Sequence, residues 1–170
     1  MTNITGFTFL STDGKTQLHG MRWEPEGRSV RAVLQICHGV AEHIARYDAF
    51  ARYLNELGIA VVGHDHLGHG GSIRTKADYG YFAEPDGNRA VLADLHAMTV
   101  HTKELYPGVP YFLLGHSMGS FYARQYLCEY GHELDGAIIM GTGFQPKALV
   151  QFAKTLCRVL AVFHGWHYRS

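Results

Sequence analysis

Hydrophobic and polar positions follow two different periods along the chain. Short apolar runs indicate strands, and longer segments with apolar residues three or four positions apart indicate helices. The runs predict strands at 7–11, 17–23, 30–37, 59–63, 111–114 and 137–140, and the helical spacing predicts helices at 45–57, 88–105, 118–130 and 147–164. Strands that alternate with helices predict an α/β fold, with a mostly parallel sheet covered by helices on both faces.

Some details of this pattern add to the prediction. The runs 7–11 and 17–23 are joined by the turn-forming residues 12–15, so we expect an antiparallel hairpin at the start of the sheet. Residues 64–87 are rich in Gly, His and Asp, and they predict a long loop region. The apolar spacing within the helix 45–57 predicts a core-facing stripe of Tyr47, Phe50, Ala51 and Leu54.

Composition limits the kinds of partner. The chain has 15 Lys+Arg against 15 Asp+Glu, so it has no basic surplus to bind a phosphate backbone, and we expect no nucleic-acid partner. Cys37, Cys128 and Cys157 are an odd number at wide spacings, with no C-x-x-C pair that could hold zinc or cycle a disulfide. With no signal-peptide pattern at the N-terminus, we predict a reducing, cytoplasmic location. The charges in 147–164 argue against a membrane span.

A candidate nucleophile stands between a predicted strand and a predicted helix. Gly115-His116-Ser117-Met118-Gly119 matches G-x-S-x-G, a sharp turn that strains the serine backbone and lifts its Oγ to the top of the sheet. The loop after the strand 30–37 begins with His38-Gly39, and such a loop donates a backbone N–H to an oxyanion. Ser117 is therefore the predicted nucleophile, with the N–H groups of Val40 and Met118 as oxyanion donors.

Three motifs together resemble a known family. His38-Gly39-x-x-Glu42-His43-x-x-Arg46-Tyr47, Asp65-x-x-Gly68-His69-Gly70-x-Ser72 and the serine motif follow one another in the order of the monoacylglycerol lipase and lysophospholipase (serine aminopeptidase-like) branch of the α/β-hydrolases. The resemblance covers about residues 30–145. It implies a serine hydrolase that cleaves small amphiphilic esters of single acyl chains through an acyl-enzyme, with no cofactor or metal, and a helical cap that contacts membrane surfaces transiently.

The resemblance also assigns residues and boundaries. It places Ser117 as the nucleophile and Val40 and Met118 as oxyanion donors, and its active-site framework matches His38, Gly39, Glu42, Arg46, Asp65, His69 and His116. Ala41 stands where many members have glycine, and its methyl group is expected to narrow the acyl pocket. Residues 1–145 are predicted to form the N-terminal part of the hydrolase core, and 146–170 the beginning of the cap.

Two members of the expected triad are missing. In this fold the acid and then the histidine follow the serine, on loops after later strands. Beyond Ser117 the chain offers the acids Glu129, Glu133 and Asp135 and the bases His132, His164 and His167, none of which has a suitable position. We therefore expect the closing strands, the acid and the base to lie outside these 170 residues, in a longer polypeptide or in a second chain, and the 170 residues alone to be inactive.

Three alternatives stay open. The first is an aminopeptidase or other amidase of the same fold, and the second is a non-catalytic binding domain. The third is a metallohydrolase that uses His64, His66 and His69, because 64–69 nearly match the metal motif H-x-H-x-D-H. Gly68 stands where that motif needs aspartate, so this third reading lacks one ligand.

Overall fold

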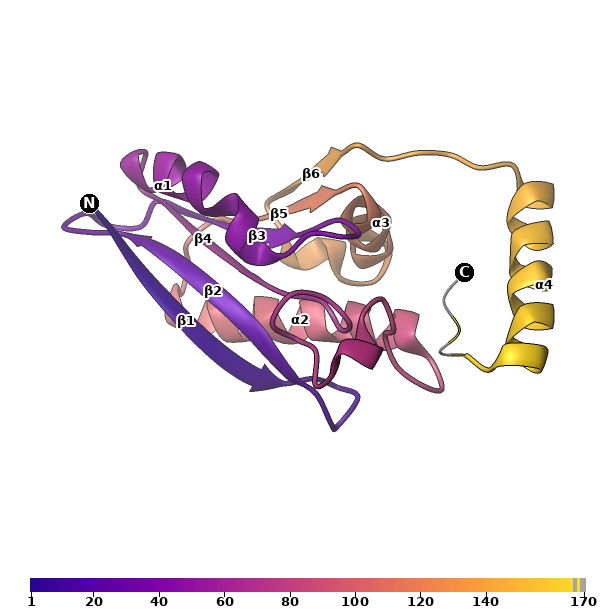
Figure 1. Cartoon of the computed structure of the whole chain (residues 1–170). Helices are drawn as coiled ribbons and strands as arrows, with labels where there is room; N and C mark the ends of the chain where they lie inside the picture. Colours follow the sequence, from indigo (N-terminus) through magenta and orange to yellow (C-terminus); the bar gives the residue numbers. More distant parts are fainter. Residues whose placement is uncertain (167, 169–170) are drawn as a thin grey trace.

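The computed structural model describes residues 1–166 and 168, so the candidate base His167 lies outside the described residues. The chain forms a six-stranded sheet with helices on both faces (Figure 1). The strands are β1 (Thr2–Leu10), β2 (Gln17–Pro25), β3 (Ala32–Cys37), β4 (Ile59–His64), β5 (Tyr111–His116) and β6 (Gly136–Met140). The α-helices are α1 (Asp48–Glu56), α2 (Gly87–Leu105), α3 (Met118–Tyr130) and α4 (Lys147–His164), and short 3-10 helices cover Ile44–Tyr47, Lys76–Asp78 and Gly131–Glu133. The predicted α/β fold class and each predicted element are confirmed.

The strand order explains where a site can form. The sheet runs β1-β2-β4-β3-β5-β6; β1 and β2 are antiparallel to their neighbours, and β4, β3, β5 and β6 are mutually parallel. The predicted hairpin and the mostly parallel sheet are therefore confirmed. In the register of β3 with β5, Cys37 lies opposite Gly115. The two chain segments that leave these strands, which begin at His38 and Ser117, consequently start side by side.

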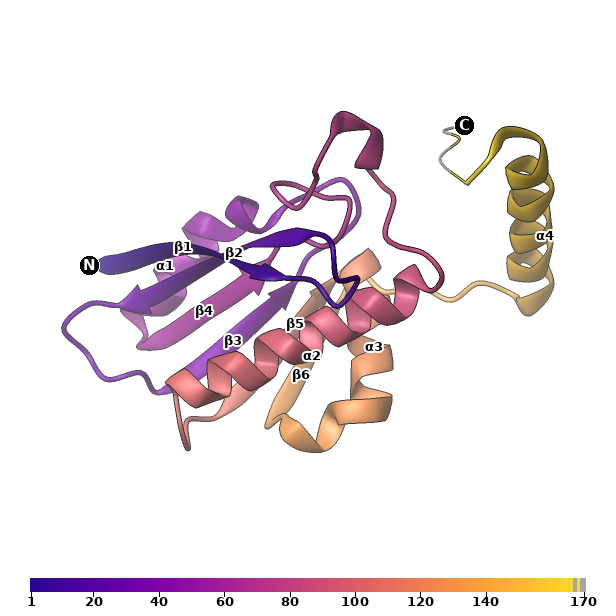
Figure 2. The same cartoon turned by 90° about the horizontal axis from the view of Figure 1, so that it is seen from below.

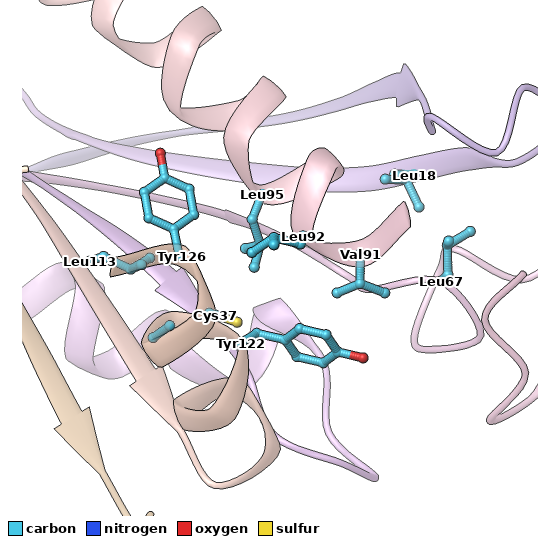
Figure 3. Packing of buried hydrophobic residues seen from close by; sticks show 10 residues of the cluster. Leu18, Cys37, Leu67, Val91, Leu92, Leu95, Leu113, Tyr122 and Tyr126 are labelled. Carbon is cyan, nitrogen blue, oxygen red and sulfur yellow. The ribbon is translucent and has the colours of Figure 1, made fainter. Parts of the chain in front are cut away.

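Helices cover the two faces of the sheet unequally. α1 lies on one face, and α2 and α3 lie on the other (Figures 1 and 2). Alternate residues of β3 separate accordingly: Leu34 and Ile36 pack into the cluster with α1, whereas Cys37 joins the cluster under α2 and α3. Figure 3 shows Cys37 in that second cluster, among leucines from several elements and the ring of Tyr122.

A buried polar network holds α2 onto the sheet. The fully buried Gln35 of β3 accepts hydrogen bonds from Thr99 Oγ1 at 2.8 Å and from the Tyr111 hydroxyl at 2.5 Å. Its amide nitrogen donates to the Leu95 carbonyl at 3.0 Å. Because these side chains satisfy one another, polar residues are tolerated inside the core at this point.

The predicted core stripe of α1 needs a correction. Ala51 is buried as expected, but Phe50 is 40% exposed and Asn55 is buried in its place. The Asn55 amide donates to the carbonyl oxygens of Trp23 and Ile59, at 3.2 and 2.8 Å. Ala51 and Asn55 are one turn apart and share a face, whereas Phe50 is rotated by about 100° from Ala51. Apolar spacing alone could not identify an asparagine as the inward residue.

The end of the described chain packs loosely against the rest. No residue of α4 within the described structure is buried, and the helix stands away from the sheet at the end of the extended segment 141–146 (Figures 1 and 2). None of the helices in the described part of the chain is long and apolar enough to cross a membrane. The division into a core at 1–145 and a cap at 146–170 stays a prediction.

The sheet also ends in an open strand. Among the described residues, β6 pairs with β5 on one side only. Ile138 lies opposite Leu114 in the register and therefore points to the α1 face, as does Met140 two residues on. They are 49% and 45% exposed, because α1 packs over β2 and β4 rather than over this edge.

Candidate active site

Ser117 occupies the turn between β5 and α3 with an uncommon backbone conformation. Its φ is +52° and its ψ is −117°, a region that residues with a Cβ rarely adopt, and such conformations cost about 1–3 kcal/mol. The turn is fixed by hydrogen bonds from Ser117 N–H to the Met140 carbonyl and from Ser120 N–H to the Ser117 carbonyl, both 2.9 Å. The strained turn predicted for the serine is confirmed.

The two glycines of the serine motif are required by close packing. A Cβ on Gly119 would lie 2.0 Å from the Cys37 carbonyl oxygen, and a Cβ on Gly115 would lie 2.5 Å from the Gly119 carbonyl oxygen. Both obstacles are backbone atoms that have no room to move. The glycines therefore allow α3 to begin directly against β3 and β5, which brings Ser117 to the loop after β3.

The loop after β3 lies close to the serine turn. Gly39 lies so close that a Cβ on it would be 3.0 Å from Ser117 Cβ. Within the described chain, the N–H groups of Val40 and Met118 have no hydrogen-bond acceptor, and Met118 is the first residue of α3, where N–H groups have no partner in the helix. Their role as oxyanion donors stays a prediction that this arrangement permits.

Glu42 joins this loop to the turn at Ser117. Its side chain is 5% exposed, and its Oε1 accepts hydrogen bonds from Gly39 N–H, from the Tyr47 hydroxyl at 3.0 Å and from His116 Nδ1 at 2.8 Å. Arg46 Nη1 lies 3.6 Å from the other oxygen, Oε2. Burial alone would raise the pKa of Glu42, but the hydrogen bonds from His116, Gly39 and Tyr47 outweigh it and lower that pKa. Glu42 is thus an ionised acceptor at neutral pH.

The contact with Glu42 also sets the orientation of His116. A carboxylate only accepts hydrogen bonds, so Nδ1 of His116 carries the proton and the ring turns toward Glu42. Ser117 Oγ makes no hydrogen bond to any described residue, His116 included. The His116 ring is therefore bonded to Glu42 and not to the serine hydroxyl.

His38 is a neutral, buried residue that orders the same loop. Its Nε2 accepts from His66 N–H at 3.0 Å, so its Nδ1 carries the proton and donates to the Gly39 carbonyl at 2.8 Å. The ring is completely buried, and burial lowers the pKa of His38 to about 4. The imidazole therefore stays uncharged at neutral pH and has a fixed tautomer.

Asp65 connects several segments near the site through its carboxylate. One carboxylate oxygen accepts from Ile44 N–H at 2.6 Å, and the other accepts from Gly71 N–H at 2.7 Å and contacts His19 Nδ1 at 3.1 Å. A Cβ on Gly70 would lie 2.2 Å from that second oxygen. Asp65 thus links the backbone of Ile44 to that of Gly71, and its place in an active-site framework stays a prediction. His69 Nδ1 donates to the Leu67 carbonyl at 2.9 Å, within this same loop.

One site feature had no clear signal in the sequence. Ala41 adopts φ +56°, a left-handed conformation that usually needs glycine. The substitution of alanine for the family's glycine was visible in the sequence, but its backbone conformation was not. The methyl group therefore introduces strain in the loop that carries Val40, whether or not it narrows an acyl pocket.

The acids and bases that follow Ser117 do not approach it. Glu133 and Asp135 lie beyond the far end of α3, about 20 Å along the helix from Ser117, and bond to His96 and to Tyr111 N–H. Glu129 pairs with Arg89, and His164 is the last residue of α4 and stacks on Tyr168. His132 belongs to the 3-10 helix after α3. No described histidine and acid therefore form a triad with Ser117.

The geometry gives no support to the metallohydrolase alternative. His66 Nε2 donates a hydrogen bond to the His38 carbonyl at 3.2 Å, and His69 Nδ1 donates one to the Leu67 carbonyl. The rings of His64 and His66 meet edge to face, with centroids 5.4 Å apart. In the part of the chain that the structure describes, no three His, Cys, Asp or Glu side chains are grouped so as to hold a metal ion.

The sheet order and the strained serine turn define an α/β-hydrolase. The family model described as "Serine aminopeptidase, S33" matches residues 28–169. Human monoglyceride lipase is 38% identical over 147 residues, which cover 81% of this chain and 44% of that protein. Monoacylglycerol lipase of Mycolicibacterium smegmatis is 31% identical over 147 residues, covering 79% of this chain and 47% of that protein.

A solved structure gives the same result. A thermostable carboxyl esterase from Bacillus coagulans, in complex with glycerol, superposes with a TM-score of 0.82 at 32% identity, covering 95% of this chain and 51% of that one. The chain belongs to the serine aminopeptidase S33 family, and the resemblance seen in the motifs is confirmed. It spans about half the length of these relatives.

Proposed function

We propose that Ser117 is the nucleophile of a serine hydrolase that cleaves carboxylic esters of single acyl chains. The observation that carries the proposal is the strained turn at Ser117, which directly precedes Met118 and lies close to Gly39 in the loop that carries Val40. The N–H groups of Val40 and Met118 have no acceptor among the described residues. A protein retains a conformation of this cost when the surrounding packing enforces it, and such positions cluster at active sites.

The proposed reaction follows from these positions. Ser117 Oγ gives its proton to a base and attacks the acyl carbon, and the N–H groups of Val40 and Met118 bind the oxygen that becomes negative. The alcohol then leaves with the proton, and water releases the acid from the acyl-enzyme. Each oxyanion donor contributes about 3 kcal/mol to the transition state.

The base and the acid come from elsewhere in this proposal. Ser117 has no histidine partner in the described residues, so we propose that a histidine and an acid from polypeptide outside these 170 residues complete the site. We accordingly expect the 170 residues alone to show no turnover of a nitrophenyl ester. Appreciable turnover by the purified chain would contradict this part of the proposal.

The substrate class rests on the relatives and on the charge. The names of the relatives are monoglyceride lipase, monoacylglycerol lipase and carboxyl esterase. The chain has equal numbers of Lys+Arg and Asp+Glu residues, which suits a neutral, amphiphilic ester better than a strongly charged substrate. We therefore propose a monoacylglycerol, a lysophospholipid or a similar single-chain ester.

Co-expression with a complementary half-protein tests the proposal. The Bacillus coagulans esterase shares this fold, and about half of its chain has no counterpart here. We would co-express that remaining half with residues 1–170, confirm by co-purification that the two associate, and treat the complex with a fluorophosphonate probe. We expect labelling of the wild-type complex and none with Ser117→Ala; an associated but unlabelled wild-type complex would contradict the nucleophile assignment.

An amidase is the second candidate, because the matching family model is named for a serine aminopeptidase. Both candidates use Ser117 in the same way, so probe labelling does not separate them. The same complex should hydrolyse a nitrophenyl acyl ester faster than an aminoacyl nitroanilide if the esterase proposal holds, and the reverse order favours the peptidase. Absence of labelling and of both activities favours a non-catalytic binding domain.

A further inference from the structure

Gly39, the residue before Val40, is held through both of its backbone polar groups. Gly39 N–H donates to Glu42 Oε1, and the Gly39 carbonyl oxygen accepts from His38 Nδ1 at 2.8 Å. His38 is fully buried and Glu42 is 7% exposed, so water competes little for either bond. Both backbone polar groups of Gly39 are therefore fixed by side chains of its own loop.

This anchoring determines where the Val40 N–H points. The Gly39–Val40 peptide is trans, since the only cis bond in the described chain is Glu84–Pro85. In a planar trans peptide the carbonyl and the following N–H point in opposite directions. Because His38 holds the Gly39 carbonyl, the Val40 N–H points away from His38. This N–H has no acceptor in the described residues.

Glu42 fixes the same loop relative to the nucleophile. His116 Nδ1 donates to the oxygen that accepts from Gly39, and His116 directly precedes Ser117. One carboxylate oxygen thus connects the segment that carries Val40 to the turn that carries Met118, through the contact of Glu42 with His116, which are 74 residues apart along the chain. The Tyr47 hydroxyl is a third donor to that oxygen and holds it in place.

We propose that Glu42 and His38 are positioning residues of the oxyanion hole. His38 sets the direction of the Val40 N–H, and Glu42 sets the distance between the Val40 and Met118 donors. The inference rests on the proposed function, because only attack by Ser117 produces an oxyanion there. Loosening either anchor weakens binding of the transition state rather than of the ester, so kcat falls and KM is unchanged.

The first test needs no catalysis. We would measure hydrogen exchange of the Gly39 amide by NMR in residues 1–170, comparing the wild type with Glu42→Gln and Glu42→Ala. We expect exchange about tenfold faster with Gln, whose neutral oxygen is a weaker acceptor, and faster still with Ala. Arg46→Gln removes only the 3.6 Å contact to Oε2, and Glu104→Gln makes the same chemical change at an exposed position; neither should alter Gly39.

NMR also reports the orientation of the Val40 N–H. The residual dipolar coupling of the Val40 N–H reports its direction, and we expect it to change in Glu42→Ala while the couplings of the sheet stay the same. A folded Glu42→Ala chain with wild-type exchange at Gly39 and a wild-type coupling at Val40 would overturn the proposal. If that variant does not fold, the Gly39 exchange rate in Glu42→Gln decides.

The second test uses the co-expressed complex described above. Glu42→Gln should lower the rate of Ser117 labelling and kcat by about tenfold with KM unchanged, whereas Glu104→Gln should match the wild type. Failure of the wild type to label counts against the proposed function and leaves the exchange result standing. Normal kcat together with faster exchange at Gly39 would overturn the positioning role.

Discussion

The backbone conformation of Ser117 lowers the stability of the fold, and a glycine at this position would remove that cost. Ser117→Gly removes the Cβ that disfavours φ +52°, so we expect the free energy of unfolding to rise by about 1 kcal/mol and the melting temperature to rise by about 2–4 °C. Thermal unfolding followed by circular dichroism measures this change. Ser117→Ala retains the Cβ and should have the melting temperature of the wild type, although both variants lose the proposed nucleophile. Equal melting of all three proteins would argue against strain at this turn.

Glycine at position 119 is required for a different reason, which is space. Gly119→Ala would place a Cβ 2.0 Å from the Cys37 carbonyl oxygen, so we expect a loss of more than about 3 kcal/mol of stability, measured by urea unfolding. Gly131→Ala is the matched control, because its Cβ would meet only Leu127, at 3.6 Å. Similar stabilities for the two variants would contradict the close approach of α3 to β3.

At the scale of elements, α4 combines an apolar face with a charge bias. From residue 136 to the end, the sequence has no Asp or Glu but includes Lys147, Lys154 and Arg158. Leu149, Phe152, Leu156, Val159, Leu160 and Phe163 share the opposite face of the helix. A cationic amphipathic helix that is unburied along its length is suited to an anionic lipid surface.

We therefore predict that α4 binds anionic vesicles. Co-sedimentation should show binding to phosphatidylcholine vesicles that contain phosphatidylglycerol, and weaker binding to phosphatidylcholine alone. Lys154→Glu should reduce that binding by about fivefold, since each basic side chain near such a surface contributes about 1 kcal/mol. Lys15→Glu, in the hairpin turn, makes the same charge change away from α4 and should have no effect. Equal binding by both variants would contradict a role for α4.

The positions of the elements were predictable from the sequence, because the signals are local, although β1 begins at Thr2 and so five residues before the predicted strand 7–11. Apolar periodicity and glycine or proline stops are properties of neighbouring residues, so the bounds of α3 and α4 agree with those predicted. The inward phase of α1 was not predictable, because Asn55 is buried by hydrogen bonds to carbonyls of Trp23 and Ile59, which the apolar pattern cannot represent.

The candidate site shows the same limit. Short motifs located Ser117 and the loop that carries Val40 as candidates, since those depend on adjacent residues. The link from Glu42 to His116 spans 74 positions and exists only once β3 and β5 are neighbours in the sheet. The tautomer of His38 likewise depends on the N–H of His66, which arrives from β4. Such contacts follow from the fold rather than from the spacing of residues.

At the scale of the molecule, buried neutral histidines make stability depend on pH. Burial lowers the pKa of His38 to about 4 and that of His64 to about 3, and it lowers the pKa of His66 well below its ordinary value of 6.5. Below pH 6.5 the unfolded chain takes up protons at these positions and the folded chain does not. The free energy of unfolding therefore falls as the pH falls, and the contribution is complete only above pH 6.5.

We expect a loss of about 1.4 kcal/mol per histidine for each pH unit below 6.5, or roughly 4 kcal/mol in all at pH 5.5. Urea unfolding between pH 7.5 and about 5 measures the slope. His64→Gln should reduce the slope by about a third, because both ring nitrogens of His64 are buried without a partner in the described chain. His132→Gln, at an exposed position, should leave the slope unchanged; a flat wild-type profile would contradict the burial of these rings as neutral groups.

The open edge at β6 has a consequence for self-association of the chain. A strand such as β6, which has no neighbouring strand on its outer side among the described residues and carries the exposed Ile138 and Met140, is a template on which another extended segment can add. Whatever strand occupies that edge, in the same polypeptide or another, determines whether growth of the sheet stops. At high protein concentration this edge favours self-association. The molecule therefore stays monomeric when it is dilute or when another strand has paired with β6.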